Sequence, residues 1–459
     1  MRIRNLILSA GAVAAAPVTA LAQDAEPALS AGDTAFVATC ALIVMLMMLP
    51  GLGLFYAGMT RSKNVLSVLT QIFAAISLIM ILWIGVGYSL FIDGTGPFLG
   101  GLGKLFLAGV TTDSLTGTIP EYLYVLFMGM FAAITPPIIV GAFAERMKFS
   151  AVLLFMGVWF MINYVPMAHM AWGGGWVFNV GVLDFAGGNV VHLNAGMAAL
   201  VCALVLGPRK GWGTTMMSPH NMTMTYTGGA MLWVGWLAFC GGCALAANGF
   251  SSLLMLNTFL GGAAGALGWM ATEWIHRGKV STFGLLSGAI AGLVAITPAC
   301  GFVGPAGAIA VGLLAAPVCV FAVEVMKPKL GYDDSFDVFG VHGVGAIVGG
   351  ILTVVFAAPS LGGAGFPEGR DMMGQMVPQV AIMGFSIVYS VVTTWVALMI
   401  VKALVGLRVD EESEYEGLDI TSHGEAGYRF SDGMFGGTAI HPQGTEGAAA
   451  MAPVRLKNA

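Results

Sequence analysis

Two stretches, AGGNVVHLNAGMAALVCALVLG (residues 186–207) and VFGVHGVGAIVGGILTVVFAA (residues 338–358), each carry one histidine inside an apolar run. Both runs reach the roughly 20 residues that cross the hydrocarbon core of a bilayer. An ionised side chain at that depth costs about 2.5 to 3.5 kcal/mol on insertion scales, so a titratable residue there is a functional candidate by default. His192 and His342 are therefore the first candidates for a functional site, and their contexts VVHLNAG and GVHGVGA are alike.

The composition of the whole chain is that of a membrane protein. Of its 459 residues, 57% are hydrophobic and 9% are charged, and 66 are glycine. Soluble globular domains carry about 25% charged residues, and small residues let membrane helices approach one another closely. We therefore expect an all-α, multi-pass membrane protein in the lipid bilayer, with no nucleic-acid partner.

Eleven apolar spans follow the N-terminal segment, each of about 20 residues or more. They cover residues 35–59, 65–92, 121–144, 149–168, 186–207, 221–247, 251–274, 281–300, 302–326, 338–358 and 377–405. The loops after spans one, three, five, seven and nine hold ten basic residues: Arg61, Lys63, Arg146, Lys148, Arg209, Lys210, Arg277, Lys279, Lys327 and Lys329. The opposite loops hold two, Lys104 and Arg370. Because basic loops remain in the cytoplasm, this asymmetry predicts an outer N-terminus and an inner C-terminus.

The chain begins with the features of a secretory signal. A basic start and an apolar run to about Val18 precede the small-x-small sequence ALA at residues 20–22. This pattern predicts a signal peptide over residues 1–22, with an uncleaved first helix as the alternative. Either outcome places residue 30 outside, and the membrane domain is predicted over residues 30–405.

The segment from Gly406 onward differs from the membrane domain in charge. It holds nine acidic and four basic residues, a net charge of −5, which equals that of the whole chain. We expect residues 406–430 to form a cytoplasmic tail with a regulatory or docking role. The alternative is that these residues are simply a solvated segment after the last helix. Residues 431–459 are low in complexity, and we predict a disordered extension there.

Ten of the eleven spans divide into two sets of five, and each histidine belongs to the last span of its set. Because five is odd, the two sets cross the bilayer in opposite senses, which predicts a five-plus-five inverted repeat with the histidines approaching near the midplane. Asp184 precedes the first histidine span and Asp337 the second. We expect both carboxylates to cap helix N-termini, a structural role.

No carboxylate falls in the middle of any predicted span. A bare cation at the bilayer centre would therefore lack the acidic partner that normally offsets its desolvation. The species that crosses there is expected to be neutral, or to give up its proton to the histidines, which would titrate as a coupled pair.

Aromatic residues at helical spacing supply a second candidate group. Phe127 and Phe131 share one face of span three, and Trp236 and Phe239 lie three apart on span six. Trp172 follows span four, where His169 is expected to be a simple interface residue. Aromatic faces attract cations and stacked rings exclude water, although ordinary packing is the commoner role of such residues.

Two cysteines raise the possibility of a soft-metal site. Cys240 and Cys243 have Cys-x-x-Cys spacing on one helix face, and with two imidazoles they could bind zinc or copper(I). No second cysteine pair or acidic entrance supports this hypothesis in the sequence, and we expect neither a metal nor a cofactor. The cysteines show no disulfide framework.

Several long motifs together resemble the ammonium transporter (Amt) branch of the Amt/Rh/Mep family, over roughly residues 30 to 428. They are PGLGLFYAG (50–58), GAFAERM (141–147), AHMAWGGG (168–175), DFAGGNVVH (184–192), GAIAGLVAITPACG (288–301) and DVFGVHGV (337–344). Trp172 favours the Amt over the Rh branch. The resemblance implies eleven membrane helices, a homotrimer with one pore per subunit, and uptake of ammonium, with methylammonium as a possible second substrate, without a prosthetic group.

The resemblance also implies roles for single residues. Phe131 and Trp172 resemble the outer vestibule that recruits the cation, Phe131 and Phe239 the stacked gate, and His192 and His342 the twin histidines of the pore. Trp236 resembles an aromatic residue near that pore, and Asp184 a buried carboxylate needed for structure.

One position departs from the family pattern, which usually has a serine one turn after the gate phenylalanine. Here that residue is Cys243, whose thiol is a weaker hydrogen-bonding group than a hydroxyl. The segments GLRV (406–409), EGLD (416–419) and HGE (423–425) resemble the family's regulatory tail, which implies docking of a PII-type protein.

These observations predict an ammonium transporter rather than an enzyme. The resemblance implies that the cation is recruited at an outer aromatic vestibule and deprotonated at the phenylalanine gate, and that ammonia then crosses an apolar pore. An ammonium sensor that signals through its tail is the alternative, and a soft-metal transporter using Cys240 and Cys243 is a distant third.

Overall fold

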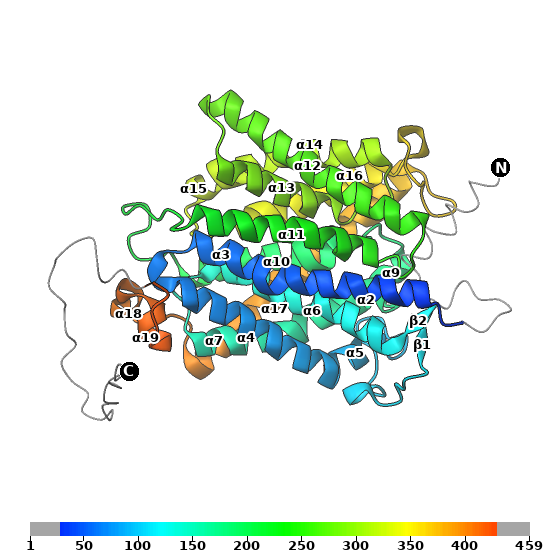
Figure 1. The fold of residues 1–459 in the computed structure, drawn as a ribbon, viewed down its shortest axis with the longest axis horizontal. Helices are drawn as coiled ribbons and strands as arrows, with labels where there is room; N and C mark the ends of the chain where they lie inside the picture. The colour runs from blue at the N-terminus through cyan, green and yellow to red at the C-terminus, as the bar shows by residue number, and fades with distance from the viewer. Residues whose placement is uncertain (1–27, 429–459) are drawn as a thin grey trace, which may run out of the picture. The chain divides into compact units, whose positions relative to one another are not determined.

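The computed structural model describes residues 28–428, and the helices within this range run side by side as a bundle (Figure 1). The all-α membrane fold class is confirmed. The predicted signal peptide over residues 1–22 and the predicted extension over residues 431–459 lie outside the described residues.

The helical segments follow the predicted spans closely. The first five are α2 (Ala31–Leu46), η2 (Met47–Leu52) and α3 (Gly53–Met59); η3 (Ser62–Asn64), α4 (Val65–Leu82), η4 (Trp83–Gly87) and α5 (Tyr88–Ile92); α6 (Glu121–Phe143); α7 (Phe149–Trp159), η6 (Phe160–Tyr164), α8 (Val165–Trp172) and α9 (Trp176–Val180); and η7 (Gly188–Leu193) with α10 (Asn194–Leu206). The next six are α11 (Met222–Gly242); α12 (Gly249–Arg277); α13 (Thr282–Ile296); α14 (Pro305–Phe321), η8 (Ala322–Met326) and α15 (Lys327–Leu330); η9 (Phe339–Gly343) with α16 (Val344–Phe356); and α17 (Met372–Val405).

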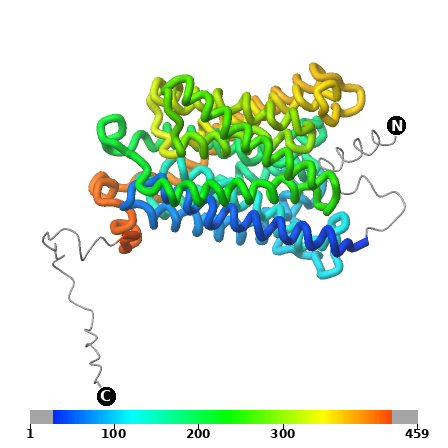
Figure 2. The backbone as a smooth tube through the Cα atoms, turned by 45° about the horizontal axis from the view of Figure 1, so that its top comes forward, coloured from blue at the N-terminus to red at the C-terminus, as the bar shows by residue number. Residues whose placement is uncertain are grey.

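Short elements connect and cover the bundle. They are η5 (Leu105–Leu107), the strands β1 (Leu115–Thr116) and β2 (Ile119–Pro120), η10 (Pro359–Leu361), α18 (Glu411–Glu416) and α19 (Leu418–His423). The β1–β2 hairpin lies at one end of the bundle, and α18 and α19 lie at the other (Figure 2).

In the described part of the chain, nine helical segments are long and apolar enough to cross a membrane. The other two predicted spans correspond to α11 and the shorter apolar helix α13. The count of eleven crossings and the orientation stay predictions. The fourth span continues past its predicted end at residue 168 to Val180, and the last begins at Met372 rather than at residue 377.

The two histidine-bearing segments share one local design. Each consists of a π-helical turn, η7 or η9, followed by a regular helix of 13 residues, α10 or α16. The carboxylate of Asp184 accepts hydrogen bonds from the backbone N–H groups of Gly187, Gly188 and Asn189, at 3.2, 2.5 and 2.8 Å. This is the capping role predicted for Asp184.

The corresponding prediction for Asp337 is wrong. The carboxylate that caps the second segment is that of Asp334, which accepts from the backbone N–H of Phe339 at 2.7 Å. Asp334 precedes His342 by the same eight residues that separate Asp184 from His192. Asp337 instead occupies the position of Gly187, and both residues have a left-handed backbone, with φ of 62° and 103°. Asp337 pairs with Lys327 through its side chain.

The two segments cross where glycines meet. A Cβ atom added at Gly196 would lie 2.2 Å from the backbone nitrogen of Gly343. Since Gly343 adjoins His342 and Gly196 is one helical turn beyond His192, this close approach brings the histidines together. Helix α17 supports the first segment, because the Ser390 hydroxyl donates to the carbonyl of Asn194 at 2.8 Å.

Candidate pore and its histidine pair

The structure brings His192 and His342 into contact. Their Nδ1 atoms lie 3.2 Å apart and their ring centroids 5.3 Å apart. Both side chains are buried, with 1% and 8% of the residue surface exposed. Because a neutral imidazole has one donor and one acceptor nitrogen, one ring donates to the other in this contact. The pair is thus arranged to share a proton.

Trp236 of α11 forms a wall beside the pair. Its ring stacks on His192 with centroids 5.0 Å apart and an interplanar angle of 22°. Trp236 also lies 6.2 Å from Phe239, centroid to centroid, so the aromatic wall runs from the histidines toward the phenylalanines.

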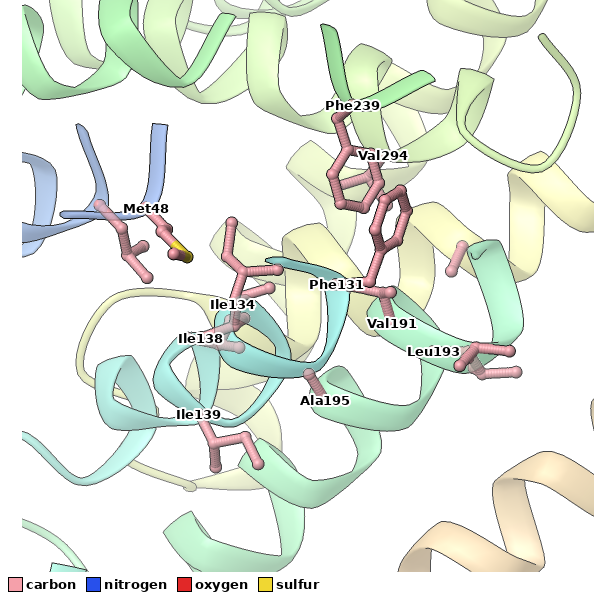
Figure 3. Packing of buried hydrophobic residues seen from close by; sticks show 14 of the residues in the cluster. Met48, Phe131, Ile134, Ile138, Ile139, Val191, Leu193, Ala195, Phe239 and Val294 are labelled. Carbon is pink, nitrogen blue, oxygen red and sulfur yellow. The ribbon is translucent and has the colours of Figure 1, made fainter. Parts of the chain in front are cut away.

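Phe131 of α6 and Phe239 of α11 stack face to face (Figure 3), with centroids 3.8 Å apart and an interplanar angle of 25°. Each residue is 1% exposed, so both rings are buried in the interior of the bundle. Trp172 meets the Phe131 ring edge-on at 5.9 Å, and Phe127 meets it from within α6 at 5.3 Å. Trp172, Phe131 and Phe239 therefore form a connected aromatic cluster.

Cys243 ends α11 one turn beyond Phe239. It is part-exposed, and its thiol donates to the carbonyl oxygen of Phe239 at 3.2 Å. Because the thiol proton is used in this bond, the sulfur can only accept a further hydrogen bond, and it does so weakly. In the described residues no group of three or more His, Cys, Asp or Glu side chains could hold a metal ion, so the soft-metal hypothesis gains no support.

Two cavities border His342. The one on the side of the phenylalanines is lined by Met47, Leu52, Phe55, Tyr56, Ile134, Ile138, Val191, His192, Leu232, Trp236, Phe239, Ile290 and His342. The one on the other side is lined by Phe55, Tyr56, Met59, Trp269, Phe283, Ser287, Ile290, Val323, Phe336, Asp337, Val341 and His342. Among these lining residues the first cavity has no carboxylate and the second has Asp337. The chamber between the phenylalanines and the histidines is thus apolar apart from the imidazoles, one phenol and one indole.

Sequence reasoning missed the roles of two residues, Asp334 and His169. Asp334 is the capping carboxylate, and burial, with the nearby charge of Asp337, raises its pKa to about 7. The eight-residue spacing to His342 could have identified Asp334. His169, predicted to be an interface residue, is buried, and its two ring nitrogens face the carbonyl oxygens of Phe91 and Gly96 at 2.7 and 2.6 Å.

A charged cluster closes the predicted cytoplasmic end of the bundle. Glu145 binds Arg61 and lies 3.7 Å from Arg209, and Arg209 forms a two-pronged pair with Asp333 at 2.8 and 2.9 Å. Although burial alone would raise it, pairing with Arg209 and Arg61 holds the pKa of Glu145 below its usual value. Hydrogen bonds from Arg209 likewise lower the pKa of Asp333 against the effect of burial.

The tail packs onto the same end. The carboxylate of Glu414 accepts from the backbone N–H of Lys210 at 2.7 Å and pairs with Arg408. The backbone N–H of Val409 donates to the carbonyl of Arg146 at 3.1 Å, and the backbone N–H of Leu418 donates to the side-chain oxygen of Asn64 at 2.8 Å. The tail thereby contacts the loops after the first, third and fifth predicted spans.

Comparison with known proteins places this geometry in a family. Residues 35–428 match the Ammonium Transporter Family. The chain is 45% identical over 406 residues to an ammonium transporter of Bacillus subtilis, covering 87% of this chain and 99% of that protein. It is also 45% identical over 417 residues to an ammonium transporter of Aquifex aeolicus, covering 89% and 96%.

Solved structures agree. The crystal structure of Candida albicans Mep2 matches with a TM-score of 0.77 and 35% identity, over 84% of this chain and 88% of that one. A structure described as a sensor Amt protein matches with a TM-score of 0.79 and 27% identity, over 85% and 98%.

Proposed function

Because this chain belongs to the ammonium transporter family, we propose that it takes up ammonium across the cytoplasmic membrane through the passage between Trp172 and His342. One observation carries the proposal. A stacked phenylalanine pair is followed by a contacting histidine pair, and the residues that line the chamber between them carry no carboxylate.

The first step in this proposal is recruitment at the outer aromatic vestibule. The faces of Trp172 and Phe131 attract ammonium, and Cys243 lies at the end of the same wall. Because the thiol already donates to the Phe239 carbonyl, it offers the cation only a weak sulfur acceptor. Recruitment therefore rests mainly on the aromatic rings.

The second step is loss of a proton at the Phe131–Phe239 pair. A bare cation in the chamber beyond would find no fixed negative charge to offset its desolvation. Neutral ammonia meets no such penalty. Ammonium thus separates into ammonia, which crosses the apolar chamber, and a proton, which passes by way of the His192–His342 contact. The two recombine beyond Asp337.

Assembly and regulation belong to the proposal as well. We infer a homotrimer with one pore per subunit and a PII-type regulatory protein that binds at the cytoplasmic face. The packing of the tail against three loops supports a tail that senses the state of the bundle.

Uptake in cells tests the function. A host that lacks its own ammonium transporters should grow on low ammonium in acidic medium, where free ammonia is scarce, only when it makes this protein. It should also accumulate labelled methylammonium, and ammonium should compete. Absence of both, with the protein present in the membrane, would refute the proposal.

A sensor is the second candidate, because a sensor Amt protein is among the structural matches. It would bind ammonium at the same vestibule and report through the tail while conducting little. Low flux in purified protein, together with an ammonium-dependent change in protease cleavage of residues 406–428, would favour the sensor.

A further inference from the structure

Thr297 lies at the junction of three elements that form the passage. It follows α13 directly and is fully buried. Its hydroxyl accepts a hydrogen bond from Nε1 of Trp236 at 2.7 Å and donates one to the carbonyl of Leu293 at 2.7 Å. The hydroxyl proton is thereby used, so it is not free to donate to a substrate.

The backbone of residues 297 and 298 also binds the segment that leads into the turn bearing His192. The carbonyl oxygen of Thr297 accepts from the N–H of Ala186 at 3.2 Å, and that of Pro298 accepts from the N–H of Phe185 at 3.1 Å. Phe185 and Ala186 lead into the π-helical turn that carries His192. The α11 ring that stacks on His192 and the turn that bears His192 are therefore both fixed to residues 297 and 298.

We propose that Thr297 is a positioning residue that sets how closely Trp236 packs on His192, and through this stack the size selectivity of the passage. The inference rests on the proposed function, since the selectivity it concerns is that between ammonium and the bulkier methylammonium. Loss of the hydroxyl leaves a buried indole N–H without its partner. The ring then turns to find another acceptor and opens the chamber beside His192.

The test compares three variants in purified, liposome-reconstituted protein. Thr297→Val keeps the shape and removes the hydroxyl, whereas Thr297→Ser keeps the hydroxyl. Thr258→Val is the matched control, because Thr258 of α12 is equally buried and donates to the carbonyl of Leu254 at 2.7 Å in the same way. Currents under ammonium and methylammonium pulses give the half-saturating concentration and the maximum for each substrate.

Thr297→Val is expected to raise the maximal methylammonium current relative to the maximal ammonium current several-fold, because the opened chamber admits the bulkier substrate. The half-saturating ammonium concentration should change less than about twofold, because recruitment lies before the gate. The methylammonium-to-ammonium ratio should rise, Thr297→Ser should restore it, and Thr258→Val should leave it unchanged. The inference is overturned if the methylammonium-to-ammonium ratio is unchanged in Thr297→Val, or if Thr297→Ser changes this ratio as much as Thr297→Val does.

A cryo-EM map of Thr297→Val separates this inference from the proposed function. The indole of Trp236 should leave its stacked position on His192 in the variant and keep it in Thr258→Val. An indole that stays in place overturns the inference even if the wild-type protein carries ammonium. An indole that moves in a protein without ammonium flux supports the positioning role and refutes the proposed function.

Discussion

In the proposed mechanism the passage is selective because the two imidazoles carry no negative charge. Replacing His342 by aspartate puts a fixed carboxylate beside His192, where it can stabilise an unsolvated cation. We expect His342→Asp to lose discrimination against potassium or to lose ammonium current altogether. Currents from liposomes at equal protein content decide this. Ammonium and potassium currents that equal those of the wild type would contradict a role for His342.

We propose that the thiol of Cys243 weakens recruitment of the ammonium cation. Serine at this position would offer a stronger acceptor while its hydroxyl still donates to the Phe239 carbonyl, as the thiol does now at 3.2 Å. Cys243→Ser should lower the ammonium concentration at half-maximal current by about twofold to tenfold, the effect of about one improved hydrogen bond. Cys243→Ala is the control. Equal half-saturation in all three proteins would show that residue 243 does not contact the cation.

Asp334 gives the fold a pH dependence. Its pKa is raised to about 7 from the ordinary 3.8, first by burial and then by Asp337. A raised pKa in the folded state means that the protonated form favours folding, so this contribution is complete below about pH 4 and is lost as pH rises through 7. The melting temperature in detergent should therefore fall between about pH 4 and 7 and level off above pH 7, and the fall should be smaller in Asp334→Asn.

Comparing the slope of melting temperature against pH in the wild type and in Asp334→Asn isolates the carboxyl group of Asp334. The amide oxygen of asparagine can still accept from the N–H of Phe339, so the cap is kept. Other groups that titrate in this range are present in both proteins and cancel in the difference. Parallel pH profiles would show that Asp334 is not the group responsible.

At the scale of the elements, the crossing of the two histidine segments is the critical contact. Gly196→Ala would place a Cβ 2.2 Å from the backbone nitrogen of Gly343, and backbone there cannot give way cheaply. We expect a loss of about 1 to 3 kcal/mol in stability, as for other overpacked sites, and a reduced ammonium current. Gly384→Ala in α17, where a Cβ would meet nothing within 4 Å, is the control. Equal melting temperatures for the two variants would contradict this account of the crossing.

Helix positions could be predicted from the sequence, because apolar length and basic loops report them directly. The register of the repeat could not. Asp337 was paired with Asp184 because each aspartate opens a similar motif, whereas the positive φ angles of Gly187 and Asp337 show that these two residues correspond. A non-glycine residue in the left-handed region gives little sign of itself in a sequence. The capping residue Asp334 was also passed over, although its eight-residue spacing to His342 equals that of Asp184 to His192.

Much of the candidate site could be found by residue type and spacing, but its contacts could not. A histidine in an apolar run is a clear signal, and His192 and His342 were found that way. Thr297 gave none, because a buried threonine near a helix end is ordinary until its hydroxyl is seen 2.7 Å from the indole of Trp236. Helix α9, beyond the three glycines that follow Trp172, was missed because a Gly-Gly-Gly sequence normally ends a helix.

For the whole molecule, we propose that an apolar passage with a contacting imidazole pair moves ammonium and excludes hydrated alkali ions. Current recordings decide this, with purified full-length protein in liposomes on an electrode exposed to matched pulses of ammonium and potassium. We predict a saturable current under ammonium, a smaller one under methylammonium and none above empty liposomes under potassium. A potassium current as large as the ammonium current, or no ammonium current from correctly folded protein, would contradict the account.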